Sequence, residues 1–220
     1  MGLLRIPYRI LRRINSLAEQ AASSRVYAKR LRDANAALAH APRPLKLNLG
    51  CGDVFFAAWI NVDLENLRKA NLVWNLTERF PLPDGSCSLI YSEHVMEHFS
   101  VEDGLKIFRE CHRLLEPGGV LRIAMPSLEY CVDAYANDSW RPDFERWEEL
   151  RGVKTRCEAL NVAMRRWGHQ WLYDREELRR RLGEAGFREF RNVEWGDSPV
   201  EELRNRETRV ETLLIVEAVR

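Results

Sequence analysis

The stretch LKLNLGCGDVFFAAWINVDLE, residues 45–65, constrains the fold of this chain more than any other. A short apolar run, residues 45–49, stops at the glycine turn Gly50–Gly52, and a second run, residues 60–64, contains an acid, Asp63. Glycine lets a backbone turn sharply and approach a ligand without interference from a Cβ atom. The residues between turn and second run leave room for only about two helical turns, so we expect a stunted first helix.

Further apolar runs follow the same rhythm and alternate with amphipathic segments. They predict strands at 71–76, 87–92, 120–125, 187–195 and 211–219, a helix over 101–115, and another that Asp174 begins, with Glu177 completing a capping-box pattern. EPGG at 116–119 is expected to stop the first of these helices. This alternation predicts an α/β fold with a doubly wound, mostly parallel seven-stranded sheet, whose ligand site lies at the carboxyl ends of the strands.

Residues 127–170 interrupt the alternation. The segment is rich in tryptophan and arginine, and it predicts helices near 141–151 and 154–167. Its aromatic residues suit sugar rings or aromatic acceptors, and its arginines could pair with phosphate or carboxylate groups. The alternative is that most of these residues form the core of two packed helices.

Charge separates the first 44 residues from the rest of the chain. Residues 1–44 hold nine of the 34 Lys and Arg residues and two of the 33 acidic residues, so they carry +7 and the remainder carries −6. Apolar and arginine positions at helical spacing predict an amphipathic helical extension over 3–39, ended by the linker APRP at 41–44. Such a helix could pack on the domain, form a homodimer, or contact an anionic membrane surface.

Several classes of protein are disfavoured by composition. No run of about 20 apolar residues predicts a membrane span, and the N-terminus lacks the pattern of a secretory signal. The five cysteines are scattered without a CxxC pair, which is typical of a reducing cytoplasm. We therefore expect a cytoplasmic protein, either free or at the inner face of the membrane. The acidic balance of 45–220 argues against a nucleic-acid partner.

The glycine turn and the acid together predict nucleoside binding. An acid at the end of the strand after a G-x-G turn can accept both hydroxyls of a ribose. The pattern is not the dinucleotide fingerprint, because no third glycine follows, and Asp53 would repel a pyrophosphate. A nucleoside that carries a cationic, amino-acid-like group fits these residues better.

Five segments in order resemble the class I S-adenosylmethionine (SAM)-dependent methyltransferases, in particular a small bacterial subgroup linked to surface-polysaccharide genes. They are LNLGCGD, INVDLE, FPLPDGSCSLIYSEHVMEHF, RECHRLLEPGGVLRIAMP and LYDREELRRRLGEAGF. The resemblance implies a methyltransferase domain over 45–220 with a Rossmann-like sheet, S-adenosyl-L-methionine as cofactor, and residues 127–170 covering the acceptor. It also implies cofactor contacts from Gly50, Cys51, Gly52, Asp53, Asp63, Asn75, Leu76, Ser92 and Glu93. Asn75 stands where the family usually has an acid near the adenine.

The segment SEHVMEHF carries the second dense group of functional side chains. His94, Glu97 and His98 would share one face if a helix starts there. A histidine could remove a proton from an acceptor hydroxyl, and His98, His169 and His94 are the candidate catalytic residues. Alternatively the trio could bind a divalent metal, although magnesium prefers oxygen ligands, or it could only cap a helix and support the cofactor pocket.

These observations lead to one principal hypothesis about function. We expect a SAM-dependent methyltransferase, and the resemblance implies that it O-methylates a sugar hydroxyl in glycan or polysaccharide biosynthesis. The alternatives are a small-molecule or natural-product O-methyltransferase, an RNA 2′-O-methyltransferase, and a cofactor-binding module without turnover.

Overall fold

The computed structural model describes residues 25, 27–36, 38–39, 41–64, 70–142, 152–209 and 211–220. The chain divides into two compact units, Met1–His40 and Ala41–Arg220. The described residues of the first unit between 25 and 39 are helical, and the rest of the helix predicted over 3–39 lies outside the described residues. Within the described part of the chain, no helix is long and apolar enough to cross a membrane.

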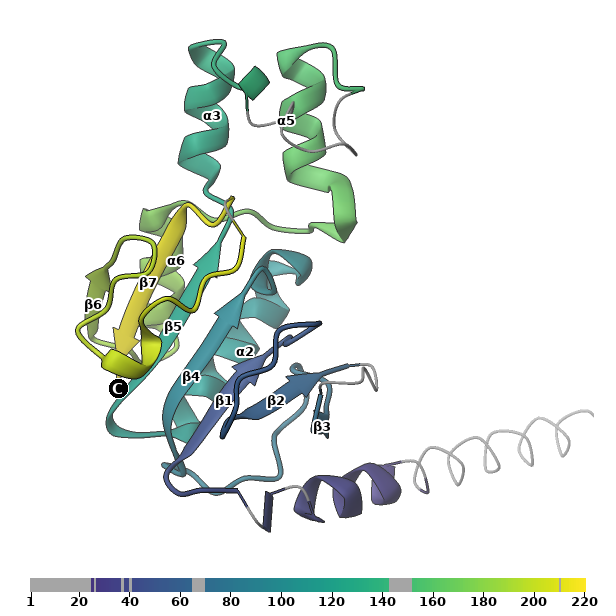
Figure 1. Ribbon diagram of the computed structural model, residues 1–220, viewed down its shortest axis with the longest axis vertical. Helices are drawn as coiled ribbons and strands as arrows, with labels where there is room; N and C mark the ends of the chain where they lie inside the picture. Colours follow the sequence, from purple (N-terminus) through teal and green to yellow (C-terminus); the bar gives the residue numbers. More distant parts are fainter. Residues whose placement is uncertain are drawn as a thin grey trace, which may run out of the picture. The chain divides into compact units, whose positions relative to one another are not determined.

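The second unit contains a seven-stranded sheet in the order β3-β2-β1-β4-β5-β7-β6 (Figure 1). All neighbouring strands run parallel except β7, which is antiparallel to β5 and β6. The predicted α/β, mostly parallel sheet is confirmed. The strands are β1 Leu45–Leu49, β2 Ile60–Asp63, β3 Leu72–Val73, β4 Cys87–Glu93, β5 Leu115–Met125, β6 Glu189–Asn192 and β7 Leu214–Val219.

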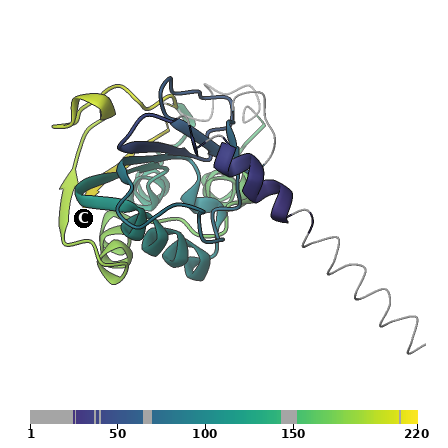
Figure 2. The ribbon, with the colours of Figure 1, turned by 90° about the horizontal axis from the view of Figure 1, so that it is seen from below.

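Two helices cover one face of the sheet. They are α2, Val101–Leu114, and α6, Arg175–Glu184, and the two helices contact each other. Figure 2 shows them together on the same side of the strands. The apolar stripe of α2 includes the buried Ile107, Phe108 and Leu114. Asp174 caps α6 as predicted by accepting a hydrogen bond from the backbone nitrogen of Glu177 at 2.8 Å.

The opposite face is covered by loops around β1, β4 and β5. Phe56 and Trp59, from the loop between β1 and β2, pack with Tyr91 of β4 and with Leu203 in one buried cluster. The stunted helix expected between β1 and β2 is wrong, because residues 50–59 form turns without a helix. The loop instead buries two large aromatic side chains, Phe56 and Trp59, against β4.

The segment EPGG forms a bulge in β5. The pairing between β4 and β5 jumps from Cys87–Leu115 to Leu89–Val120, so residues 116–119 lie outside the regular ladder. Helix α2 ends at Leu114, directly before this segment, as predicted, and the chain passes straight into β5. The regular part of β5 begins at Val120, where the sequence predicted the strand.

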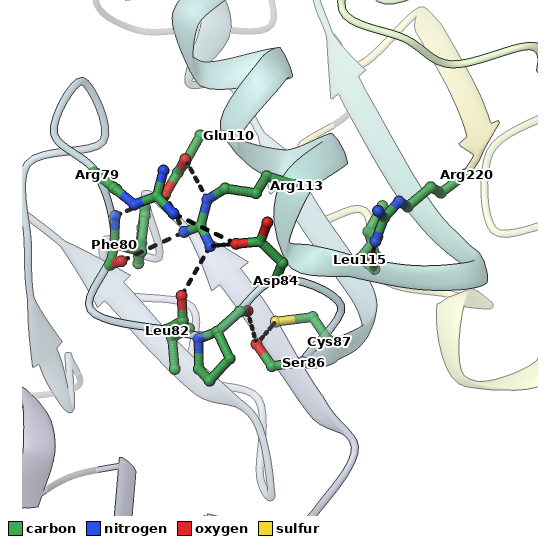
Figure 3. A network of polar contacts seen from close by, with 11 residues as sticks. Arg79, Phe80, Leu82, Asp84, Ser86, Cys87, Glu110, Arg113, Leu115 and Arg220 are labelled. Carbon is green, nitrogen blue, oxygen red and sulfur yellow. Dashed lines mark hydrogen bonds and ion pairs between the residues drawn. The ribbon is translucent and has the colours of Figure 1, made fainter.

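A polar network fixes the carboxyl end of α2 to the loop before β4 (Figure 3). The Arg113 guanidinium donates to the Glu110 carboxylate at 2.6 Å, to Asp84 Oδ1 at 2.6 Å and to the Leu82 carbonyl at 2.9 Å. Glu110 in turn accepts from the backbone nitrogen of Phe80 at 2.7 Å. These hydrogen bonds stabilise the base of the sheet at the end away from the carboxyl ends of the strands.

Helices α3, Leu128–Ala136, and α5, Arg156–Arg165, lie beyond the carboxyl end of β5 (Figure 1). They contact each other, and Trp140 packs with Ala134 and Ala159 in a small buried core. Trp140 is therefore a core residue. The predicted helix 154–167 is present but shorter, and most of the segment predicted as a helix over 141–151 lies outside the described residues.

Candidate functional site

The glycine turn lies against the carboxyl end of β2. Gly50 and Gly52 both adopt positive φ angles, of 61° and 47°, which glycine tolerates without strain. The backbone nitrogen of Gly52 donates to Asp63 Oδ2 at 2.9 Å, and the backbone nitrogen of Cys51 donates to the Val62 carbonyl at 3.0 Å. The glycine turn and the acid Asp63 are therefore in direct contact.

Two buried asparagines hold the loop after this turn, and the sequence analysis missed both. Asn48 on β1 donates to the Val54 carbonyl at 2.9 Å and to Asn61 Oδ1 at 3.0 Å. Asn61 on β2 accepts from the Phe56 nitrogen at 2.9 Å and donates to its carbonyl at 3.0 Å. The signal was a polar residue at the same place in two otherwise apolar strands. These hydrogen bonds satisfy backbone groups of Val54 and Phe56 in the loop between β1 and β2.

The glycine turn also touches the segment that carries the histidines. A Cβ atom on Gly50 would lie 2.3 Å from Cγ2 of Val95, so only glycine allows this approach. Cys51 is buried, and burial raises the pKa of its thiol to about 11, with the Asp63 carboxylate acting in the same direction. Cys51 is therefore a protonated thiol at neutral pH. Asp53, by contrast, is exposed.

The other predicted cofactor residues near the adenine and methionine ends lie on the same edge of the sheet. Asn75 follows β3, and its Oδ1 accepts from the backbone nitrogen of Thr77 at 3.1 Å and from the Thr77 hydroxyl at 2.9 Å. With Oδ1 engaged, the amide group left for a ligand is Nδ2, a donor. Leu76 and Ser92 are buried, and among the described residues the Ser92 hydroxyl has no hydrogen-bond partner.

Glu93 is committed to the loop before β7. Its carboxylate accepts from the Thr208 nitrogen at 2.8 Å, the Thr208 hydroxyl at 2.7 Å, the Arg209 nitrogen at 3.2 Å and the Thr212 hydroxyl at 3.1 Å. The structure therefore shows that Glu93 anchors this loop, and its expected contact with the methionine end of the cofactor stays a prediction. No pattern in the sequence pointed to Thr208 or Thr212.

His94 is similarly held by this loop. Its backbone has a φ of 51°, its Nε2 lies 3.0 Å from the Thr212 hydroxyl, and its Nδ1 lies 3.3 Å from Glu97 Oε1. The helix expected from His94 is only the short 3₁₀ helix η1, Met96–His98. The hypothesised metal trio of His94, Glu97 and His98 is not among the groups of converging ligand atoms in the described part of the chain, and Nε2 of His94 contacts Thr212 instead.

Glu97, His98 and His169 form a cluster of side chains that could hold a metal ion. Each of Glu97, His98 and His169 offers a ligand atom, and these three atoms all lie within 4.8 Å of one another. The His98 and His169 rings meet edge to face with centroids 5.0 Å apart. The structure thus brings together two histidines that lie 71 positions apart and that the sequence identified as candidate bases.

Backbone and side-chain hydrogen bonds hold His169 in this position. The Glu97 carbonyl accepts from the backbone nitrogens of Gln170 at 2.7 Å and Trp171 at 3.2 Å, and the Gln170 side chain donates to the His98 carbonyl at 2.7 Å. Burial lowers the pKa of His98, although the Glu97 carboxylate opposes this effect. Burial therefore favours the neutral imidazole, in which one ring nitrogen carries a lone pair.

Part of the chain matches a known protein family. Residues 47–123 match a family model described as "Methyltransferase domain". A phosphoethanolamine N-methyltransferase from Plasmodium falciparum (isolate 3D7) is 29% identical over 107 residues, which are 44% of this chain and 37% of that protein. The match thus spans little more than a third of that relative.

Solved structures of methyltransferases resemble the chain over a greater length. A putative O-methyltransferase from Nostoc punctiforme PCC 73102 has a TM-score of 0.50 at 12% identity, over 86% of this chain and 55% of that one. A SAM-dependent methyltransferase from Archaeoglobus fulgidus has a TM-score of 0.48 at 17% identity, over 80% and 85%. At such identity the first likeness concerns the fold alone. The match of residues 47–123 to the methyltransferase domain supports the predicted class, a SAM-dependent methyltransferase, and S-adenosylmethionine as its cofactor.

Proposed function

We propose that this chain transfers the methyl group of S-adenosylmethionine to a sugar hydroxyl in glycan biosynthesis. The observation that carries the proposal is the glycine turn bonded to Asp63 at the carboxyl ends of two adjacent parallel strands, within a segment that matches a methyltransferase domain. Asp63 would accept the ribose hydroxyls, and Gly50 to Gly52 would pass under the methionine part. Asn75 would donate from Nδ2 to the adenine edge.

The reaction is an in-line attack of the acceptor oxygen on the sulfonium methyl. A C–O bond forms while the S–C bond breaks, S-adenosylhomocysteine leaves, and the acceptor hydroxyl loses its proton. The protein mainly aligns the two reactants. His98 and His169 are the residues that activate the hydroxyl, because they form one cluster and Val95 joins that cluster to the glycine turn.

The proposed sugar acceptor is supported by exposed aromatic residues beside His169. Trp167 and Trp171 keep 45% and 38% of their surface exposed, and the Trp167 and His169 rings lie 5.8 Å apart. Trp167 also has a φ of 59°, and strained backbone of this kind is concentrated at functional sites. An indole face offers a flat apolar surface with a polar edge, which suits the faces of a sugar ring.

The test is methyl transfer by the full chain to a panel of sugar acceptors, followed as S-adenosylhomocysteine formation. We expect His98→Ala and His169→Ala to lower turnover by at least 100-fold, while the Kd for S-adenosylhomocysteine changes less than threefold. His112→Gln, a histidine outside the cluster, is the matched control. Wild-type turnover in both alanine variants would refute the assignment, and methylation of phosphoethanolamine in place of every sugar would refute the acceptor class.

The basic segment 1–44 is proposed to bring the enzyme to an anionic surface or to a second copy of the chain. Its charge of +7 against −6 for the remainder supports an electrostatic role. Flotation with vesicles that contain anionic lipid, and mass measurement in solution, test the two options on the full chain and on a chain without residues 1–44. Equal behaviour of the two chains in both assays would refute the proposal.

A further inference from the structure

We propose that Glu97, His98 and His169 bind a divalent transition-metal ion such as Zn²⁺ or Co²⁺, which orients and activates the acceptor hydroxyl. The inference rests on the proposed function for the acceptor, but the metal site itself rests on three observations. These are the proximity of the three ligand atoms, the burial of Glu97 and the hydrogen bond that fixes His169. The ligands come from two segments, η1 and the residues after α5.

Glu97 is the first observation. Its side chain is completely buried, and among the described residues neither carboxylate oxygen has a hydrogen-bond partner. The Nδ1 atom of His94 lies 3.3 Å from Oε1 of Glu97. A buried carboxylate without hydrogen bonds is costly. A cation between Glu97 and the two imidazoles would satisfy it.

His169 is the second observation. Its Nδ1 lies 2.8 Å from the Ala163 carbonyl, so Nδ1 carries the proton and donates it to that oxygen. The lone pair is therefore on Nε2. Metal-binding histidines almost always donate their other ring nitrogen in this way, which fixes both the tautomer and the ring orientation. Gln170 and Trp171, bonded to the Glu97 carbonyl, hold His169 in register with the other two ligands.

The spacing of the three ligand atoms is the third observation. Ligands at about 2.1 Å from an ion lie roughly 3.4 to 4.2 Å apart, depending on whether their positions are tetrahedral or opposite. The three atoms lie within 4.8 Å of one another, so binding requires them to close by at most about 1.4 Å. Imidazole ligands suit zinc and neighbouring transition metals better than magnesium. Three protein ligands leave a position open, as in catalytic sites.

The ion would change how the hydroxyl is activated. A hydroxyl bound to a divalent ion has a lowered pKa, so its proton can pass to water as the C–O bond forms. Direct transfer of that proton to His98 or His169 is then unnecessary, because their lone pairs bind the ion. His94 is a positioning residue, since its contacts with Thr212 and Glu97 orient the carboxylate.

The experiment titrates Zn²⁺ into the chelator-treated full chain by calorimetry and records the visible spectrum after Co²⁺ addition. All proteins carry Cys157→Ser, which removes an exposed thiol that could bind metal elsewhere. We expect one ion per chain, with affinity at least 30-fold weaker in His169→Ala and in Glu97→Gln. His112→Gln is the control and should bind as tightly as the parent. Thermal unfolding of each apo protein establishes that the variants are folded.

Two results would overturn the proposal. One is the absence of Zn²⁺ binding by the parent protein, and the other is equal binding by the parent and the folded cluster variants. S-adenosylhomocysteine binding is measured separately on the same proteins. A parent that binds S-adenosylhomocysteine but no metal refutes this inference and leaves the proposed function standing. A parent that binds metal but no S-adenosylhomocysteine supports the metal site and refutes the proposed function.

Discussion

Gly50→Ala offers the most quantitative test of how the glycine turn is built. Gly50 and Gly52 both have positive φ angles, so alanine at either position costs about 1–2 kcal/mol of folding free energy from the left-handed backbone. Only at Gly50 does the new Cβ meet another residue, at 2.3 Å from Cγ2 of Val95, whereas nothing lies within 4 Å at Gly52. Overpacking of this kind adds about 1–3 kcal/mol.

We therefore expect Gly50→Ala to lower the free energy of unfolding by about 2–5 kcal/mol and Gly52→Ala by about 1–2 kcal/mol. Urea unfolding followed by circular dichroism measures both, provided that the slope with denaturant stays constant. Because Val95 directly precedes η1, we also expect Gly50→Ala to weaken S-adenosylhomocysteine binding. Gly118→Ala is a second control, since this glycine also has a positive φ and open space around it.

A double-mutant cycle tests whether the contact with Val95 causes the extra destabilisation by Gly50→Ala. Val95→Ala removes both Cγ atoms, so the pair Gly50→Ala and Val95→Ala should be more stable than the sum of the single effects by about 1–3 kcal/mol. Equal destabilisation by Gly50→Ala and Gly52→Ala, together with strict additivity in the cycle, would show that the contact with Val95 does not constrain the turn.

Two further predictions concern the core and the cysteines. Arg122 is completely buried and donates hydrogen bonds to Glu207 at 2.7 Å and Glu217 at 2.8 Å. Arg122→Met should therefore lower the free energy of unfolding by about 3–5 kcal/mol, because it leaves two buried carboxylates uncompensated. Urea unfolding measures this, and a loss below about 1 kcal/mol would contradict the prediction. Burial raises the pKa of the Cys51 thiol to about 11, so at pH 8 iodoacetamide should label the exposed Cys157 first and leave Cys51 unmodified, as mass spectrometry of peptides would report. Labelling of both cysteines at equal rates would contradict the second prediction.

The sheet was predictable because its signals are local. Buried strands of a parallel sheet form short apolar runs, and β1 was predicted with the bounds that the structure shows. The loop between β1 and β2 was not predictable as turns, because Phe56 and Trp59 replace a helix by tertiary packing against Tyr91. The segment VFFAAW contains no glycine, proline, asparagine or aspartate that would predict a turn.

In the candidate site, too, local features could be predicted and long-range contacts could not. Gly50, Gly52 and Asp63 were identified because turn chemistry and strand ends can be recognised along the sequence. The partners of Glu93 and His94 in the structure, Thr208 and Thr212, could not be predicted because they are more than 110 positions away. The pairing of His98 with His169 could only be suggested, since long-range hydrogen bonds to Gln170 and Trp171 set it.

Calorimetric titration of S-adenosylhomocysteine into the full chain and into Asp63→Asn tests the central claim most directly. Asparagine keeps an oxygen that can accept from the Gly52 nitrogen, but it loses the second acceptor that a ribose diol requires. We predict binding by the parent protein at one site per chain, with affinity at least about 10-fold weaker in Asp63→Asn, a loss of about 1.4 kcal/mol. No binding by the parent protein, or equal binding by the two proteins, would contradict the assignment of Gly50 to Asp63 as the cofactor site.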